Sequence, residues 1–387
     1  MQKNMSDAMF QEQKRRKKRK IISTIMAWIL VLFIIVAIAF IVMSLVMAAG
    51  GKSLRGERTN SRPNLVLEES EQDTGDAQES YESSSPNKEV TDESMETVVV
   101  WQEGWVRHNG KIYEYNDDIM TFLVLGIDDM DVVTESTTAT GGGQSDAIFL
   151  VIANPDKKEI NILAVNRDTM TDIQMYGMGP DGTTVTAYGQ LATQHGFGDG
   201  KELSCELTRD TVSALFYDLP IHGYVSINMG AIAKLNDAIG GVEITALEDV
   251  PKAGLKKDEK CTLKGMDAFW YVKWRDTKVF ESNRGRLARQ KQYLSAFTTK
   301  VKDAVKKDIT IPVTLYQELN KYIVTDINVD EVTYLVGELL DYKLDSEAIR
   351  TLEGVTEMGE KHEEFYPDKD AMKELMITLF YEEVEID

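Results

Sequence analysis

The sequence predicts an α/β (α+β) fold: a three-layer sandwich with a central mixed sheet flanked by helices, preceded by one transmembrane helix and a disordered linker. Three short apolar runs with strand character follow one another at Thr121–Ile127, Ala147–Ile152 and Ile160–Val165. Later segments show the three- and four-residue apolar spacing of amphipathic helices. Near the start, the uncharged stretch Ile21–Ala49 is long enough to cross a bilayer as a helix.

The first 97 residues are predicted to anchor and tether the chain. Residues 1–20 form a basic tail with eight Lys or Arg, and such tails stay cytoplasmic. Residues 21–49 are therefore interpreted as an uncleaved signal anchor, with the rest of the chain outside the cell. Residues 50–97 hold twelve acidic and five basic residues with almost no aliphatic periodicity, which predicts a solvated, disordered acidic linker. The expected protein is single-pass in the cytoplasmic membrane, with an extracellular body.

The body is divided into a domain at 98–310 and a helical extension at 311–387. It opens with a predicted hairpin at Trp105–Tyr115 that turns at Asn109-Gly110. Gly240-Gly241 is expected to end one helix before a strand at Val242–Ala246. The predicted helical ranges are Val212–Leu219, Met229–Ile239, Leu263–Val272, Leu287–Val305, Thr314–Tyr322, Val329–Leu340 and Asp368–Tyr381.

The charge of the chain argues against nucleic acid as the main partner. Its 387 residues include 64 acidic and 43 basic side chains, a net charge of −21, whereas phosphate backbones bind basic surfaces. The segment Lys273–Gln290 nevertheless holds six Lys and Arg. Arg286 and Arg289 are three residues apart and would share one face of a helix. The segment fits a phosphate-rich ligand, because guanidinium groups match phosphate oxygens; the alternative is a solvated basic helix face.

Polar residues also stand at the ends of the three predicted strands. Asp128 follows the first, Asp146 precedes the second, and Arg167-Asp168 follow the third. Ligands of α/β folds lie beyond strand ends, and carboxylates near phosphate suit Mg²⁺ or Mn²⁺. A turn or helix-capping role for each Asp is the alternative.

Taken together, the order and spacing of five motifs resemble the LytR-CpsA-Psr family over roughly Thr121–Lys300. These motifs are LGIDD at Leu125–Asp129, SDAIFLV at Ser145–Val151, NRDTM at Asn166–Met170, GGV at Gly240–Val242, and YVKWRD with NRGRLARQ. The predicted topology of basic tail, membrane helix and exported domain is similar as well.

The resemblance implies a membrane-anchored phosphotransferase. Such an enzyme takes a glycopolymer (teichoic acid, capsular polysaccharide or another wall polymer) from a polyprenyl-pyrophosphate carrier and joins it to peptidoglycan as a phosphodiester. It also implies that Asp128 and Asp146 hold Mg²⁺ or Mn²⁺, and that the lipid occupies an apolar tunnel. The implied pyrophosphate-binding residues are Arg167, Lys273, Arg275, Arg286, Arg289 and Gln290, and the implied catalytic residues are Arg167, Arg275, Arg286 and Asp128.

Some positions depart from the family pattern. The family often has Arg at Lys273 and an acidic residue at Asn283, so that Asp276 or Glu281 would have to replace the missing acid. Gln190 stands where relatives tend to show a basic residue. These departures keep two other functions open: a non-catalytic binder of polyprenyl phosphates or wall glycans that acts in envelope regulation, and a polyprenyl-pyrophosphate pyrophosphatase.

The remaining reactive side chains are assigned structural roles. His195 and His222 are interpreted as packed or solvated histidines rather than general bases. Cys205 and Cys261 lack the partners of a catalytic thiol, and an exported domain permits a disulfide between them without requiring it.

Overall fold

The computed structural model describes residues 49–54, 62–65, 89–90, 99–102, 104–276 except 139, 282–339 except 309, 312–314, 316 and 318, and 341–385 except 344–347. The basic tail and residues 21–48 of the apolar stretch lie outside these residues, so the signal anchor stays a prediction. Within the described ranges, no helix combines the length and the apolar character that crossing a bilayer requires.

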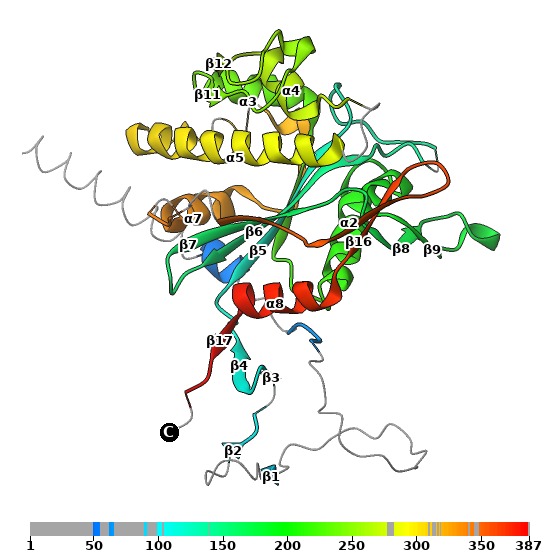
Figure 1. Cartoon of the computed structure of the whole chain (residues 1–387), viewed down its shortest axis with the longest axis vertical. Helices are drawn as coiled ribbons and strands as arrows, with labels where there is room; N and C mark the ends of the chain where they lie inside the picture. Colours follow the sequence, from blue (N-terminus) through cyan, green and yellow to red (C-terminus); the bar gives the residue numbers. More distant parts are fainter. Residues whose placement is uncertain are drawn as a thin grey trace, which may run out of the picture.

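A mixed six-stranded sheet forms the centre of the body (Figure 1). The strand order is β13-β10-β5-β6-β7-β14, with β10 parallel to β5, β14 parallel to β7 and the other neighbours antiparallel. The strands are β5 (Met120–Ile127), β6 (Ser145–Asn154), β7 (Glu159–Val165), β10 (Gly223–Asn228), β13 (Ile323–Thr325) and β14 (Ile349–Thr351). The three predicted apolar runs are therefore β5, β6 and β7, and the predicted central mixed sheet is confirmed.

Helices cover both faces of this sheet. Because side chains alternate along a strand, Leu123 and Leu125 of β5 pack under α2 (Glu202–Leu215) and α8 (Lys369–Phe380). Phe122 and Val124 face the opposite layer, which consists of α5 (Ser282–Lys307) and α7 (Val329–Leu339). The helical layers thus sandwich the sheet (Figure 1).

A second, smaller core lies beside α5. It contains α3 (Ile232–Ala238), α4 (Met266–Lys273) and the antiparallel pair β11 (Val242–Thr245) and β12 (Lys260–Leu263). Tyr271 is fully buried in this core. Gly240 and Gly241 have φ angles of 83° and 88°, as expected for the glycines that end α3 before β11.

Short hairpins and turns complete the fold. The hairpin of β3 (Trp105–His108) and β4 (Lys111–Tyr115) turns at Asn109-Gly110 with φ angles of 48° and 76°, which confirms that prediction. The other strands are β1 (Glu89–Val90), β2 (Val99–Val100), β8 (Met170–Met175), β9 (Val185–Gln190), β15 (Gly354–Met358), β16 (Glu363–Pro367) and β17 (Tyr381–Glu383). The 3₁₀ turns are Pro180–Gly182, Leu191–Phe197, Met229–Ala231, Pro251–Ala253 and Asn320–Tyr322.

Helix α2 begins at Glu202, well before the predicted start at Val212. Its buried face is filled largely by Ser204, Thr208 and Thr211, so its first half shows little apolar periodicity. The Asp199 carboxylate accepts hydrogen bonds from the backbone N–H groups of residues 201 and 204, at 2.7 and 3.1 Å, and so stabilises the start of the helix.

Residues 311–387 differ from the expected helical extension. They supply both edge strands of the central sheet, β13 and β14, the hairpin of β15 and β16, and strand β17 beside β4. Two described pieces of the predicted disordered linker, residues 50–54 and 62–65, also pack on the body, with Leu54 and Leu65 buried. Cys205 and Cys261 are both free, so the optional disulfide is not formed.

Candidate anion-binding site

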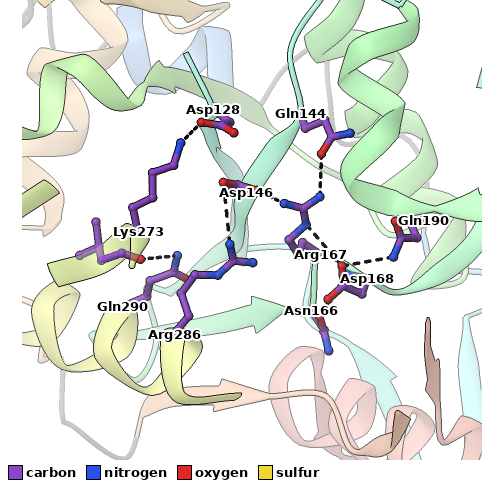
Figure 2. A network of polar contacts seen from close by, with 11 residues as sticks. Asp128, Gln144, Asp146, Asn166, Arg167, Asp168, Gln190, Lys273, Arg286 and Gln290 are labelled. Carbon is purple, nitrogen blue, oxygen red and sulfur yellow. Dashed lines mark hydrogen bonds and ion pairs between the residues drawn. The ribbon is translucent and has the colours of Figure 1, made fainter. Parts of the chain in front are cut away.

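The predicted strand-end residues meet at one end of the central sheet. Ile127 of β5 pairs with Ser145 of β6, and Ile148 of β6 pairs with Val165 of β7. The end of β5, the start of β6 and the end of β7 are therefore neighbours, and Asp146 lies within β6 rather than before it. Figure 2 shows the side chains that gather there.

A tight turn after β7 presents Arg167. The Asn166 side-chain oxygen accepts a hydrogen bond from the backbone N–H of Asp168 at 3.0 Å, and the Asn166 carbonyl accepts one from the N–H of Thr169 at 3.1 Å. Such a side-chain-to-backbone bond is the usual way in which Asn stabilises a turn. Asn166 therefore stabilises the turn that holds Arg167 in place.

Arg167 is the centre of a polar network. Its guanidinium donates to Asp146 Oδ1 and, over 2.7 Å, to Gln144 Oε1, and its Nε lies 3.4 Å from Asp168 Oδ1. The Arg167 side chain is 15% exposed and that of Asp146 is 4% exposed. Nε is buried without a hydrogen bond.

Helix α5 brings a second arginine to the same carboxylate. Arg286 lies in the first turns of α5, is 5% exposed, and places a guanidinium nitrogen 3.8 Å from Asp146 Oδ2 (Figure 2). A Cβ on the neighbouring Gly285 would lie 2.9 Å from Glu248 Oε1, the end of a flexible side chain that can move aside. Asp146 is the carboxylate that Arg167 and Arg286 share.

A third arginine lies close enough to act electrostatically on both. The pKa of Arg167 is lowered to about 10, mainly by burial; Asp168 opposes this shift, and Arg286 and Arg275 add to it. The pKa of Arg286 is also lowered to about 10, again mainly by burial, and Arg275 is the next largest cause. Arg167 and Arg286 both remain charged at neutral pH. The positive charge they concentrate is only partly neutralised by the nearby carboxylates.

Lys273 and Asp128 extend the site at its more exposed side. Lys273 ends α4, and its ammonium group forms an ion pair with Asp128 Oδ1 (Figure 2). Burial and the charge of Arg286 lower the pKa of Lys273. The Asp128 side chain is 44% exposed, so this pair can open to a ligand at lower cost than the buried pair of Asp146 and Arg167.

The structure does not bring Arg289 into the site. Its side chain is 1% exposed, and Nε donates to the Tyr271 carbonyl at 2.7 Å. The other two nitrogens donate to Glu248 and to the Trp274 carbonyl. Gln290 likewise donates to the Val272 carbonyl, at 3.2 Å. Both residues tie α5 to the end of α4, and so they hold the segment that carries Lys273 and Arg275.

Two contributors were missed as site residues by the sequence analysis. Gln190, at the end of β9, donates to Asp168 Oδ1 at 3.3 Å and to the Glu363 carbonyl at 2.8 Å. Glu363, in β16, raises the pKa of Arg286. Gln190 could be found as a departure from the family pattern, whereas Glu363 lies far along the chain and outside every motif. Of the suggested substitutes for the missing acid, Asp276 is exposed and Glu281 lies outside the described residues.

His195 and His222 pack in the interior, which is one of the two structural roles predicted for them. His195 Nδ1 is 2.7 Å from the Gly142 carbonyl oxygen, and His222 Nδ1 accepts a hydrogen bond from the Thr121 N–H at 3.1 Å. Both are 1% exposed. Burial lowers the pKa of His195 and raises that of the nearby Cys205 thiol to about 12, so neither group suits acid–base or nucleophilic chemistry at neutral pH.

The carboxylates fit a divalent cation only together with phosphate. The described residues contain no group of three or more His, Cys, Asp and Glu side chains placed to hold a metal ion. Asp128 and Asp146 are two hard oxygen donors, each already paired with a cation. Mg²⁺ is often bound by one or two carboxylates that are completed by substrate phosphates and water, and a diphosphate would supply the missing oxygens and compete for Arg167 and Lys273.

Two cavities lie beside β11 and α5, and none of the described arginines lines either of them. They have volumes of about 530 and 590 Å³, and both are bordered by Glu243 of β11 and Gln292 of α5. The first reaches Ile349 of β14 and the second reaches Cys261 of β12. Neither is lined by a predicted site residue, so the apolar tunnel stays a prediction.

Comparisons with known proteins agree with the motifs. The LytR_cpsA_psr family model matches residues 69–379, a wider range than the motifs cover. A TagU from Halalkalibacterium halodurans, named polyisoprenyl-teichoic acid–peptidoglycan teichoic acid transferase, is 30% identical over 55% of this chain and 62% of its own length. A TagU of the same name from Enterococcus faecalis is 27% identical over 65% of this chain and 73% of its own.

The fold is also found among solved structures. The crystal structure of TagV from Bacillus subtilis matches with a TM-score of 0.51 at 20% identity, over 67% of this chain and 95% of that one. At this identity the likeness supports the fold alone. The chain spans less than two thirds of the first relative's length, but the family model covers most of the chain. The protein belongs to the LytR_cpsA_psr family.

Proposed function

We propose that the protein is a membrane-anchored phosphotransferase that joins a glycopolymer, carried on polyprenyl pyrophosphate, to a hydroxyl of peptidoglycan. The observation that carries this proposal is the meeting of Arg167 and Arg286 at Asp146 at the end of the sheet, with Arg275 near enough for its charge to lower the pKa of both. The names of the relatives support the same chemistry.

In the proposed reaction, the acceptor hydroxyl oxygen attacks the phosphorus that bears the glycan. The bond from this phosphorus to the bridging oxygen breaks, polyprenyl phosphate leaves, and the proton of the hydroxyl ends on that monophosphate. Phosphoryl transfer asks a protein mainly for positioning and for positive charge where negative charge develops. Arg167 and Arg286 hold the diphosphate from two sides, and Arg275 and Lys273 add charge from the segment after α4.

A divalent cation, Mg²⁺ or Mn²⁺, would be held by Asp128 and Asp146 together with diphosphate oxygens. When bound, it would neutralise developing negative charge on the phosphates. In this arrangement, Asp146 also orients Arg167 through their direct hydrogen bond.

The test is turnover by the purified full-length protein in vesicles, with a polyprenyl-pyrophosphate glycan, a peptidoglycan acceptor and Mg²⁺ or Mn²⁺. Arg286→Ala is expected to lower kcat/KM by about 10²–10³-fold, because a preorganised charge is lost from the transition state. Asp146 keeps its hydrogen bond from Arg167 in this variant, so the melting temperature should stay close to the wild-type value. Arg284→Ala, an exposed arginine of the same helix, is the matched control and should keep full turnover.

The product separates this proposal from the two alternatives. Attached glycan supports the transferase, and phosphate release without acceptor favours the pyrophosphatase. Tight binding of the lipid-linked glycan without turnover favours the non-catalytic binder. If Arg286→Ala melts far below the wild type, Arg286 is a structural ion-pair residue and the proposed site is wrong.

A further inference from the structure

The described residues that directly follow the apolar stretch are docked on the body. Residues 49–54 are helical, and Leu54 is 0% exposed. Leu54 belongs to a buried cluster with Met120 and Phe122 of β5, and residues of α7 pack against the same cluster. We call residues 49–54 the docked segment.

Two glycines let the docked segment lie against α7. A Cβ on Gly50 would stand 2.4 Å from the Asp330 carbonyl oxygen, and a Cβ on Gly51 would stand 2.8 Å from the ring of Tyr334. Asp330 and Tyr334 are four residues apart and so lie on one face of α7. Larger side chains at either glycine would push the segment off this helix.

A partly buried hydrogen bond connects the docked segment to the start of α7. Ser53 Oγ donates to Glu331 Oε1 at 2.7 Å, and Glu331 is 1% exposed. The other carboxylate oxygen of Glu331 accepts from the Asn328 N–H at 2.9 Å, while Asn328 Oδ1 accepts from the Glu331 N–H at 3.0 Å. This reciprocal pair is a capping box, so the docked segment binds to a rigid helix end.

The docked segment and the arginines lie at opposite ends of the sheet. Met120 and Phe122 are at the start of β5, whereas Asp128 follows its end. Eight residues of strand separate the two ends, a length of about 27 Å. Figure 1 shows α7, which receives the docked segment, on the other side of the body from the hairpin of β8 and β9.

We propose that the docked segment holds the body directly against the bilayer, with α7 and the start of β5 toward the lipid and the arginines facing away. This inference shares one premise with the proposed function, namely that residues 21–49 cross the membrane. Ala49 is the last residue of the apolar stretch and Leu54 is buried on the body, so only four residues of the sequence lie between the predicted membrane span and the buried contact. A body on a flexible linker of 48 residues, at 50–97, would show no preferred orientation.

The test measures energy transfer from a fluorophore on the body to an acceptor dye on lipid headgroups. The full-length protein is reconstituted in vesicles, with Cys261→Ser and one new cysteine, either Val329→Cys at the start of α7 or Tyr176→Cys after β8. Both positions are exposed, at 42% and 53%, and Cys205 is buried. Transfer should be high from position 329 and low from position 176. Equal transfer from the two positions would overturn the inference.

Insertions separate docking from a flexible tether. About ten Gly and Ser residues placed between Ala48 and Ala49 add roughly 17 Å of free chain ahead of the docked segment, and should abolish the difference between the two labels. The same insertion after Gly75 lies beyond the docked segment and should leave the difference intact. If the difference survives the first insertion, or is lost with the second, the docked segment does not set the orientation.

Point variants test the contact itself. Leu54→Asp should reduce the difference between the labels, whereas Lys52→Asp, at an exposed position of the docked segment, should not. Retention of the difference in Leu54→Asp would count against the proposal. Flotation of the protein with the vesicles is measured in the same samples. A protein that does not float lacks the predicted anchor, and this result would contradict the membrane anchoring in the proposed function rather than the orientation of the body. None of these readouts requires turnover.

Discussion

Two arginines three residues apart on α5 have different environments. Arg286 reaches the Asp146 carboxylate at the end of the sheet, whereas Arg289 is enclosed by backbone carbonyls and Glu248. Their three-residue spacing predicted that both lie on one face of a helix. One turn of α5 does contact both the end of the sheet and the end of α4. The difference arises because Trp274, at the end of α4, packs over Arg289, with its ring centre 5.4 Å from the guanidinium carbon.

Arg289→Ala is therefore expected to act on stability. The substitution leaves the carbonyls of Tyr271 and Trp274 without their donor and opens a cavity under α4, at a cost of about 2–4 kcal/mol in the free energy of unfolding. Thermal unfolding should show a melting temperature lower by roughly 5–12 °C. Arg284→Ala should change it by about 1 °C at most. A variant with unchanged melting and no turnover would instead make Arg289 a ligand-binding residue.

Buried His195 gives the fold a dependence on pH. Burial lowers its pKa below the ordinary 6.5, so the unfolded chain takes up a proton more readily than the folded one. The stabilisation is fully present above about pH 6.5 and is lost as the pH falls toward the folded-state pKa. Urea unfolding between pH 7 and pH 5.5 should show His195→Gln losing less stability per pH unit than the wild type, by up to about 1.4 kcal/mol. Equal slopes would mean that His195 titrates normally.

At the site, the sequence was informative where a residue adjoins a strand. Asp128, Asp146 and Arg167 were placed correctly at one end of the sheet, because apolar runs show where strands end. Gln190 and Glu363 depend on how a separate hairpin, β15 and β16, lies against the turn after β7, where the Asp168 carbonyl accepts a hydrogen bond from the Phe365 N–H. No local pattern encodes that contact.

The elements that the sequence missed are short or polar. Strands β13 and β14 have three residues each, too few to show alternation. Helix α2 buries Ser and Thr, and the hairpin of β8 and β9 carries polar residues on both faces, so neither element shows a clear apolar pattern. The long apolar strands β5 and β6 were predicted with small errors at their ends, because they are buried on both faces. Helix α5 was predicted from its amphipathic spacing, but its polar first turns hid its start at Ser282, ahead of the predicted start at Leu287.

Helix α8 shows how one polar residue fixes the start of a predicted helix. The Asp368 carboxylate accepts hydrogen bonds from the N–H groups of Asp370 and Ala371, at 2.9 and 3.0 Å. Asp368→Ala should cost about 1 kcal/mol and lower the melting temperature by about 2–4 °C. Asp370→Ala, in the exposed first turn, removes no cap and should have a smaller effect. Similar losses in both variants would assign the effect to helix-dipole charge rather than to capping.

Charge is distributed unevenly over the whole molecule. The chain carries a net charge of −21, yet Arg167 and Arg286 converge on one end of the sheet. The packing, in turn, joins residues that lie far apart in the sequence. Phe365, Met376 and Phe380, near the carboxyl end, share the largest core cluster with Leu123 and Leu150 of the central strands.

This packing predicts that residues 311–385 are required for folding. A fragment of residues 62–310 lacks both edge strands of the sheet and the apolar face of α8, so the face of β5 and β6 that carries Leu123, Leu125 and Leu150 keeps α2 but loses the rest of its cover. We expect it to aggregate or to melt without a cooperative transition. A fragment of residues 62–385 should unfold cooperatively. Calorimetry of the two fragments is the test. A sharp transition in the shorter fragment would show that the last strands and helices are not required for folding.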